Sequence, residues 1–390
     1  MAIVRCPEKY SIDVFIDNRN KIKQLFAERE KDNKIKKFRF FKNLIDSTRD
    51  TLRNFPKIIK ILLTRRRKNT VYVAAIFYDG LGDMVRYKSA VLELVKMNPD
   101  IIIDIYNKSS QPIFKDMRNV RFFLNIDAVN LIKRYYDVVY MFDFFTAYPM
   151  LMKKGLRLTD KISENLLKYK EKYAICFDKF HTYELIENGI NVINLLKITS
   201  GVDNIEDISF NIKPKELPLT KFGIDDNTLY LTFQCGAGGS GNSDDPKCWS
   251  LKSWEKLLSI LKVRIGNKIK FIQVGTGNHY ISGVDINLSG KTSLDELFCV
   301  LNKSLFHIDI DGACSHFTRA LGTKSLIIFG PTDGFFSCYP ENINVISSLC
   351  NGCWTSSICP LGYDKILCME SITPEFVADK VVEQIELIMN

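Results

Sequence analysis

Short apolar stretches alternate with longer amphipathic stretches along most of this chain. The first clear one, Val71–Phe77, contains no charged residue and is rich in residues that favour strands. Apolar runs of this length between helical segments are typical of strands buried in a parallel sheet. The strands expected in the first half are Val71–Phe77, Ile101–Ile105, Asn119–Phe123, Asp137–Tyr140 and the weaker Ala174–Phe177. Those expected in the second half are Leu229–Phe233, Lys270–Val274, His307–Ile310 and Ser325–Phe329. The alternation predicts an α/β fold.

The length of the chain favours two domains. At 390 residues it exceeds most single domains. Pro214 and Pro218 interrupt the pattern and place a boundary near residue 215. We therefore expect a basic, mostly helical N-terminal extension over 1–70, an α/β domain over 71–215, and a second α/β domain over 216–390 that includes a cysteine-rich segment, 350–368.

The composition fits a cytoplasmic protein. No window approaches the roughly 18 uncharged apolar residues that a membrane span needs, and Met1 to Asp13 lack the basic-then-apolar order of a signal peptide. In a reducing compartment the 11 cysteines would be thiols or metal ligands rather than disulfides.

The net charge of +9 is concentrated between Arg19 and Lys68, where Lys and Arg alternate with Phe, Ile and Leu. Two interpretations stay open. The basic face is either a solvated surface of helices packed on the body, or a contact surface for an acidic partner or an anionic membrane, which would place the protein peripherally at the inner membrane. Nucleic-acid binding is not expected, because no groove-reading or stacking module is visible.

Two turns after predicted strands carry candidate chemistry. Val71–Phe77 runs into a turn with Gly80, Gly82 and Asp83, and a helical pattern follows over Tyr87–Met97. Glycines in such a turn let a backbone approach a phosphate or a sugar.

The second unit of this kind is a strand, loop, helix and strand that ends in Gly330-Pro331-Thr332-Asp333. Its helix follows Gly312 and is closed by Gly322. Ligands of doubly wound sheets bind at the carboxyl ends of strands. This predicts one pocket for Asp311, His316, Thr332 and Asp333.

A glycine-rich loop, Gly236–Gly241, matches the dinucleotide fingerprint G-x-G-x-x-G. Its context differs from that of a nicotinamide or flavin enzyme, because the helix begins only near Ser250 and the next strand ends in Gly275 rather than in an acidic residue. The loop can still wrap a phosphate, and Lys247 just before the helix is placed to meet one.

Four cysteines near the C-terminus, Cys350, Cys353, Cys359 and Cys368, are spaced C-x2-C-x5-C-x8-C with turn residues between them. Four thiolates this close suit a closed, structural zinc or iron site. The alternative is a set of free thiols in a loop, since the longer spacings are not those of a zinc ribbon.

Six blocks now stand in a fixed order over about residues 71–390: Gly80-Leu-Gly-Asp83, Lys247-Cys-Trp249 with Trp254, Gly290–Leu297, Asp309–Gly322, Phe329–Asp333, and Cys350 to Val377. As a set they resemble glycosyltransferase family 9, which includes lipopolysaccharide heptosyltransferases. The resemblance implies a GT-B arrangement, in which two Rossmann-like domains face a central cleft. It also implies inverting sugar transfer without a catalytic metal or other cofactor.

The resemblance also assigns roles. Asp83 matches the aspartate of the family's glycine turn and is the candidate catalytic base, beside the turn residues Gly80 and Gly82. Lys247 matches a lysine that meets donor phosphate, and Asp311 matches an acidic residue that holds sugar hydroxyls. Gly312 and His316 begin the helix that faces the diphosphate. Thr332 and Asp333 lie at the neighbouring strand end.

Each assignment has a structural alternative. Asp83 and Asp311 can each cap a helix, Lys247 can be a solvated lysine, and the imidazole of His316 can bond to the backbone. We expect a bacterial transferase that moves heptose from ADP-heptose to lipopolysaccharide core or to a protein hydroxyl, in an assembly that can be oligomeric. The alternative is an inactive GT-B scaffold that binds a partner through its metal-stapled tail and basic arm.

Overall fold

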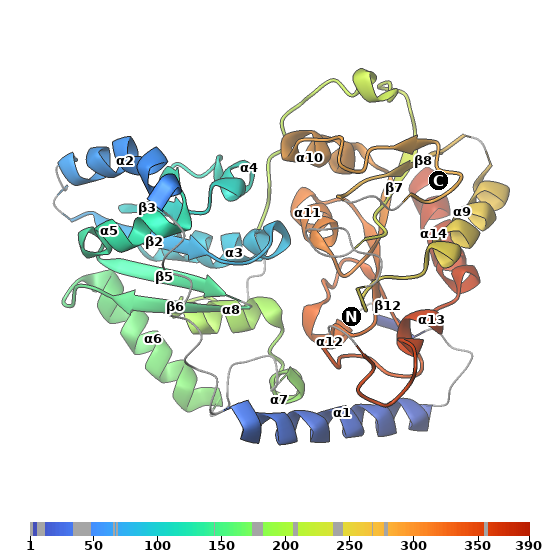
Figure 1. Cartoon of the computed structure of the whole chain (residues 1–390), viewed down its shortest axis with the longest axis horizontal. Helices are drawn as coiled ribbons and strands as arrows, with labels where there is room; N and C mark the ends of the chain where they lie inside the picture. The colour runs from blue at the N-terminus through green and yellow to red at the C-terminus, as the bar shows by residue number, and fades with distance from the viewer. Residues whose placement is uncertain are drawn as a thin grey trace. The chain divides into compact units, whose positions relative to one another are not determined.

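The computed structural model describes residues 3–5, 12–33, 48–64, 67, 69–143, 145–173, 182–205, 210–236, 245–266, 268–276, 280–354 and 358–390. The chain divides into two compact units (Figure 1), one made of residues 26–210 and the other of residues 1–25 with 211–390. Each unit has its own sheet. The predicted strand Ala174–Phe177 and most of the glycine-rich loop, 237–244, lie outside the described residues.

The unit of residues 26–210 is built on a five-stranded sheet in the order β4-β3-β2-β5-β6. Its strands are β2 (Val71–Phe77), β3 (Ile101–Tyr106), β4 (Val120–Leu124), β5 (Val138–Asp143) and β6 (Thr146–Leu151). Neighbouring strands run parallel except at the edge, where β6 pairs antiparallel with β5. Every residue of β2, the central strand, is buried, as its unbroken apolar sequence predicts.

The helices of this unit are α2 (Thr48–Leu63), α3 (Leu81–Met97), α4 (Gln111–Phe114), α5 (Val129–Ile132), α6 (Arg157–Tyr173), α7 (Thr182–Glu187) and α8 (Val192–Ser200). Short 3-10 turns cover Lys108–Ser110, Ile126–Ala128 and Lys133–Tyr135. Helix α3 begins six positions before the predicted Tyr87, because Gly80 already serves as its N-cap. The turn with Asp83 is therefore the first turn of a helix that follows a buried strand.

The second unit is built on a seven-stranded sheet in the order β1-β12-β11-β10-β7-β8-β9, in which all the pairs are parallel. Its strands are β1 (Ile3–Arg5), β7 (Tyr230–Phe233), β8 (Lys270–Gln273), β9 (Ile286–Asn287), β10 (Phe306–Ile310), β11 (Ser325–Phe329) and β12 (Ile343–Ile346). Both units thus have the α/β architecture with parallel sheets that the sequence predicts.

The helices of the second unit are α9 (Leu251–Ile265), α10 (Leu294–Lys303), α11 (Ala313–Leu321), α12 (Gly334–Ser337), α13 (Leu367–Glu370) and α14 (Pro374–Met389), with a 3-10 turn at Thr220–Phe222. Gly322 closes α11 with a positive φ of 82°, which a glycine adopts without strain. Helix α14 packs against α9 within this unit.

The N-terminus does not form a separate extension over 1–70. Strand β1 pairs with β12 at the edge of the second sheet. Helix α1 (Ile12–Asn33) contributes Phe15 to a core cluster with Ile327 and Phe329 of β11, and Asn18 donates a hydrogen bond of 3.0 Å to the backbone of Leu349. The first 25 residues therefore belong to the second unit, because strand pairing and apolar burial over a long sequence separation hold them there.

Candidate functional site

Three of the predicted donor-site residues meet at the carboxyl ends of β10 and β11. The Asp311 carboxylate accepts a hydrogen bond of 2.8 Å from the Thr332 hydroxyl, and the Lys247 ammonium lies 2.9 Å from the same carboxylate oxygen. Asp311 and Thr332 are buried, whereas the Lys247 side chain is 36% exposed. A cation that is still half exposed beside a buried acid can reach an anionic ligand from solvent.

The local sequence explains this convergence. Strands β10 and β11 are parallel neighbours in register, so the residues that follow them emerge at the same edge of the sheet. Asp311 is fixed there by its backbone N–H, which donates to Ile328. Lys247 comes from a turn in which its backbone N–H donates to the Asp245 carboxylate at 2.9 Å.

Gly312 is the N-cap of α11, and no side chain caps that helix. Asp311 therefore does not act as a simple cap, and its carboxylate is used by Lys247 and Thr332 instead. A Cβ atom on Gly312 would lie 2.9 Å from the Gln234 amide nitrogen, so glycine allows close packing at the start of α11. The first backbone N–H groups of this helix follow Asp311 directly in sequence and can contribute to anion binding.

His316 contacts a tyrosine of the same unit. Its Nδ1 atom lies 2.8 Å from the hydroxyl of Tyr339, and the two rings pack edge to face. The imidazole is buried. This geometry agrees with a structural role for His316, although its partner is a tyrosine hydroxyl and not the backbone that the sequence suggested.

Asp333 has a structural partner that the sequence did not reveal. One of its carboxylate oxygens accepts a hydrogen bond of 2.9 Å from Phe335 at the start of α12, and the other forms a 3.3 Å ion pair with Arg19 of α1. The Arg19 guanidinium also lies over the Phe335 ring. Burial raises the pKa of Asp333, and the charge of Arg19 opposes this shift. Asp333 thus links α1 to the start of α12.

The cysteine-rich segment packs against the loop that carries Thr332. The Asn351 amide donates to the backbone oxygens of Gly330 at 2.8 Å and Thr332 at 3.0 Å. Gly352 has a φ of +88°, and a Cβ atom there would lie 2.5 Å from the Asp333 carboxylate, so this close approach requires glycine. The segment therefore positions the Thr332 loop through backbone contacts.

Within this segment the thiols of Cys350 and Cys368 share a hydrogen bond, which lowers the pKa of Cys350 and raises that of Cys368. The charges of Cys353 and Cys359 also act on Cys368, so all four predicted ligands gather in one region. Among the described residues, no three of these four sulfurs lie within 4.8 Å of one another. The four sulfurs are therefore not at the distances that separate the ligands of one metal ion. One other group, His307, Asp309 and Cys314, does meet that distance.

The candidate base lies in the other unit. Asp83 is in the first turn of α3, its side chain is 31% exposed, and it forms a 3.3 Å ion pair with Arg86. Gly80 has open space where a side chain would stand, whereas Gly82 is buried in the helix. The Asp79 carboxylate of the same turn accepts a hydrogen bond from Tyr87.

Two residues of this unit, Asp143 and Phe145, were not predicted from the sequence. Asp143 ends β5, the neighbour of β2, and burial raises the pKa of its carboxyl group. The Arg86 guanidinium lies over the ring of Phe145, which has a positive φ of 75°. A carboxylate at the end of a parallel strand was the available signal for Asp143, but the apolar pattern stopped at Tyr140.

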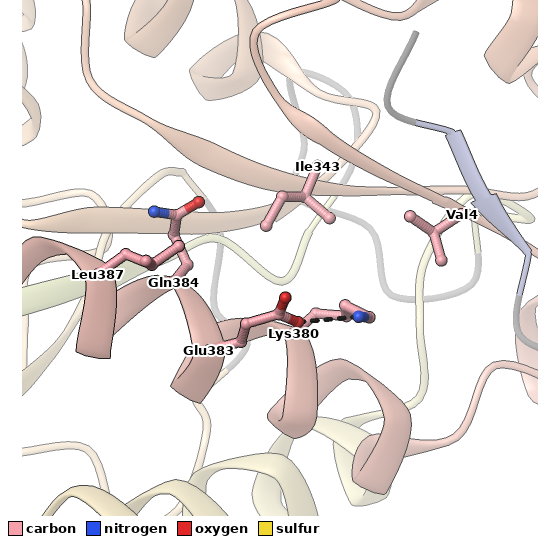
Figure 2. Close-up of a pocket in the computed structure, with 6 residues that line it drawn as sticks. All are labelled: Val4, Ile343, Lys380, Glu383, Gln384 and Leu387. Atoms are coloured by element: carbon pink, nitrogen blue, oxygen red, sulfur yellow. Dashed lines mark hydrogen bonds and ion pairs between the residues drawn. The ribbon is translucent and has the colours of Figure 1, made fainter.

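A pocket of about 240 Å³ lies elsewhere in the second unit, beside β1, β12 and α14 (Figure 2). Its lining is Val4, Ile343, Lys380, Glu383, Gln384 and Leu387. Lys380 and Glu383, both on α14, form an ion pair at 2.8 Å in this lining. None of the predicted site residues lines it.

Residues 208–357 match the model of glycosyltransferase family 9 (heptosyltransferase). The match includes Lys247, Asp311 and Thr332 and confirms the predicted resemblance for this region. A comparison with the sequences of curated proteins gives no match.

Solved structures share the fold. The ADP-heptose lipopolysaccharide heptosyltransferase II of E. coli aligns at 14% identity with a TM-score of 0.53, covering 82% of this chain and 98% of that protein. The dodecameric, iron-containing heptosyltransferase TibC, solved in complex with ADP-D-beta-D-heptose, aligns at 15% identity with a TM-score of 0.58, covering 83% of this chain and 79% of that protein. TibC from enterotoxigenic E. coli aligns in a further structure at 14% identity with a TM-score of 0.56, covering 82% of this chain and 80% of TibC. These likenesses confirm the predicted fold class.

Proposed function

We propose that this chain is an inverting glycosyltransferase that transfers a sugar, heptose from ADP-heptose, to a hydroxyl acceptor. The observation that carries the proposal is the contact of Lys247 and Thr332 with the Asp311 carboxylate, inside the region that matches glycosyltransferase family 9. The complex of TibC with ADP-D-beta-D-heptose supports the choice of donor.

The proposed chemistry uses one residue set for each reactant. Lys247 and the N-terminus of α11 bind the diphosphate of the donor and stabilise its negative charge as it leaves. Asp311 orients the sugar through its hydroxyls. Asp83 removes the proton of the acceptor hydroxyl while that oxygen attacks the anomeric carbon, so that the configuration inverts. The Arg86 guanidinium lies 3.3 Å from the Asp83 carboxylate and places a positive charge beside it.

We assign the acceptor side to the domain of residues 71–215 and the donor side to residues 216–390. The acceptor is a glycan, such as lipopolysaccharide core, or a protein hydroxyl. No helix among the described residues is long and apolar enough to cross a membrane. A cytoplasmic enzyme that meets the inner membrane peripherally is consistent with the exposed apolar side chains Phe55, Leu62 and Leu63 on the basic helix α2.

We further propose that Cys350, Cys353, Cys359 and Cys368 hold a structural zinc or iron ion, and that the chain forms oligomers. The clustering of the four thiols supports the metal site. TibC, which shares the fold, contains iron and is a dodecamer. A bound metal would draw the four sulfurs together and would fix the segment that supports the Thr332 loop.

The test is a panel of ADP-, UDP- and GDP-sugars, ADP-heptose included, incubated with the purified protein. Binding and slow release of nucleotide diphosphate without acceptor are followed for each donor. The proposal expects ADP-heptose to bind and to release ADP. Binding of another donor with release of its nucleotide would keep the transferase and replace the sugar. If no donor of the panel binds and none releases its nucleotide diphosphate, the result would contradict the proposal and favour the inactive scaffold.

A further inference from the structure

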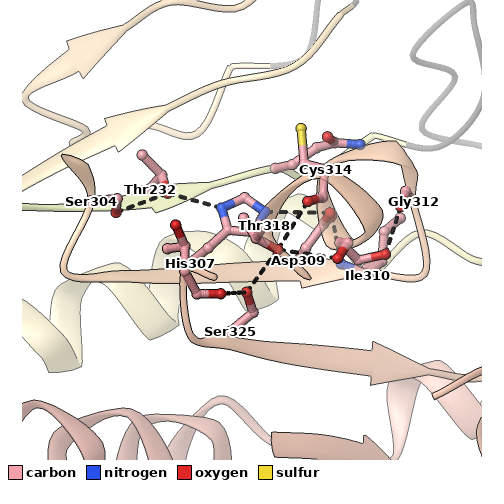
Figure 3. Close-up of polar contacts among 12 residues, drawn as sticks. Thr232, Ser304, His307, Asp309, Ile310, Gly312, Cys314, Thr318 and Ser325 are labelled. Carbon is pink, nitrogen blue, oxygen red and sulfur yellow. Dashed lines mark hydrogen bonds and ion pairs between the residues drawn. The ribbon is translucent and has the colours of Figure 1, made fainter. Parts of the chain in front are cut away.

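A second polar group is buried in the second unit, next to the proposed donor site. His307 and Asp309 alternate on β10, and Cys314 belongs to the first turn of α11 (Figure 3). The exposed fractions of these residues are 0%, 0% and 1%. Their potential ligand atoms all lie within 4.8 Å of one another. Residues of this kind are rarely buried together without a partner that offsets their desolvation.

The hydrogen bonds around His307 favour a proton on its Nδ1 atom. The Ser304 hydroxyl donates to the backbone oxygen of Phe306 at 2.8 Å, and the Thr232 hydroxyl donates to Ser304 at 3.1 Å. The Thr232 oxygen is then free to accept from His307 Nδ1, which lies 2.9 Å away (Figure 3). A neutral imidazole that carries its proton on Nδ1 presents a lone pair at Nε2.

That lone pair points at a second acceptor. His307 Nε2 lies 3.4 Å from Asp309 Oδ2, and neither atom has a hydrogen-bond partner among the described residues. The other oxygen of Asp309 is held at 2.8 Å by the backbone N–H of Ile310. Two buried acceptors that face each other repel unless a positive charge lies between them. A proton would serve, and so would a metal ion.

The Cys314 thiol favours a metal ion over a proton at this position. The Cys314 sulfur lies within 4.8 Å of a ring nitrogen of His307 and of a carboxylate oxygen of Asp309, and a nitrogen, an oxygen and a sulfur grouped in this way can chelate one ion. Zinc bonds of about 2.0 Å place two such ligand atoms about 3.3 Å apart on a tetrahedral ion, close to the 3.4 Å between His307 and Asp309. The hydrogen bond from Nδ1 to Thr232 supplies the outer contact that orients a metal-binding imidazole.

We propose that His307 Nε2, the Asp309 carboxylate and the Cys314 thiolate form a structural site for a divalent transition metal, with zinc as the preferred ion. The ion ties β10 to the start of α11, and it is distinct from the four-cysteine segment. The charge of Asp309 also acts on the thiol of Cys235, which places a second thiol near the same carboxylate. Binding of the ion releases the Cys314 proton.

The test compares metal content in the full-length chain after loading with Co²⁺ and desalting. Cys314→Ser and Asp309→Asn are each expected to bind one equivalent of Co²⁺ less than the wild type, with a matching loss of thiolate-to-cobalt absorption. Cys299→Ser removes another buried thiol, one that contacts the backbone of Leu217 instead, and should keep the wild-type content. Counting the difference separates this site from any ion in the four-cysteine segment. Equal metal content in wild type and Cys314→Ser would overturn the proposal.

X-ray absorption of the cobalt-loaded wild type keeps the proposal testable if both ligand variants fail to fold. We expect nitrogen and oxygen scatterers in the metal shell in addition to sulfur. A shell of sulfur alone, or a wild type that retains no cobalt, would overturn the assignment.

Discussion

The Lys247 ammonium lies 2.9 Å from the Asp311 carboxylate, although the two residues are 64 positions apart in the chain. Asp311 stands at the end of β10, and Lys247 reaches it from the turn before α9. Because the Thr332 hydroxyl binds the same oxygen, a buried acid is held between a cation and a donor. In the proposed function this arrangement prepares Lys247 for the donor diphosphate.

Replacing Asp311 separates a binding role from a structural one. Asp311→Asn keeps an oxygen that can accept from Thr332 but loses the charge. We expect donor affinity to fall about tenfold, the size of one charged hydrogen bond, while the free energy of unfolding changes by less than about 1 kcal/mol, since Lys247 is partly exposed. Donor titration and urea unfolding measure the two quantities. A large loss of stability with unchanged donor affinity would make Asp311 structural.

Removing the proposed base should affect turnover and leave donor binding intact. Asp83→Asn keeps the size of the side chain but cannot take a proton. We expect the turnover number to fall by about 10² to 10⁴, the usual contribution of a general base. Asp79→Asn, in the same turn, is the matched control, because Asp79 is already engaged by Tyr87. Equal effects of the two substitutions would remove the base assignment.

The ion pair of Arg19 with Asp333 predicts a stability change that depends on pH. Burial raises the folded-state pKa of Asp333, so the folded state binds more protons than the unfolded chain between the ordinary and the raised pKa, and stability falls as pH rises through that window. Arg19→Gln raises the folded-state pKa of Asp333 further, because it leaves the buried carboxylate without its cation. The range of pH over which stability falls therefore becomes wider.

We therefore expect Arg19→Gln to lose about 3 kcal/mol of unfolding free energy at pH 7 and clearly less at pH 4.5, as measured by urea unfolding. In the Asp333→Asn background the same substitution should show little dependence on pH. A loss that is equal at both pH values in the chain that retains Asp333 would contradict this account of the ion pair.

The four-cysteine segment should carry metal in the purified protein. We expect elemental analysis to find one zinc or iron per chain at these thiols, and Cys353→Ser to lose it. Because Asn351 and Gly352 support the Gly330–Asp333 loop, the variant should also bind donor more weakly. Cys338→Ser, a buried thiol outside the segment, should keep both properties. Unchanged metal content in Cys353→Ser would contradict the site.

Local signals made much of the fold predictable. Val71–Phe77 is a strand with the predicted bounds, because an unbroken apolar run between turn residues has few other uses. The helix after Gly312 ends before Gly322 as expected, since a glycine with positive φ is a strong stop signal. Asp311 and Thr332 could be grouped because parallel strand ends share one edge of a sheet, whereas Lys247 was assigned to the donor phosphate from its place before a helix and from the family resemblance.

Residues held by distant partners could not be predicted in this way. Strand β1 has only three residues and forms through its pairing with β12, more than 300 positions away. The binding of Arg19 to Asp333 and of His316 to Tyr339 depends on packing between elements that are far apart in sequence. No local periodicity encodes such contacts, and the basic N-terminal stretch therefore looked like a separate extension.

Calorimetric titration of ADP-heptose into the wild type and into Lys247→Ala measures what this lysine contributes to donor binding. We expect the wild type to bind and the variant to bind at least about tenfold more weakly, because a charged contact to phosphate is lost. Lys252→Ala removes an exposed lysine on α9 and should bind like the wild type. Equal affinity of wild type and Lys247→Ala for ADP-heptose would contradict the donor site proposed here.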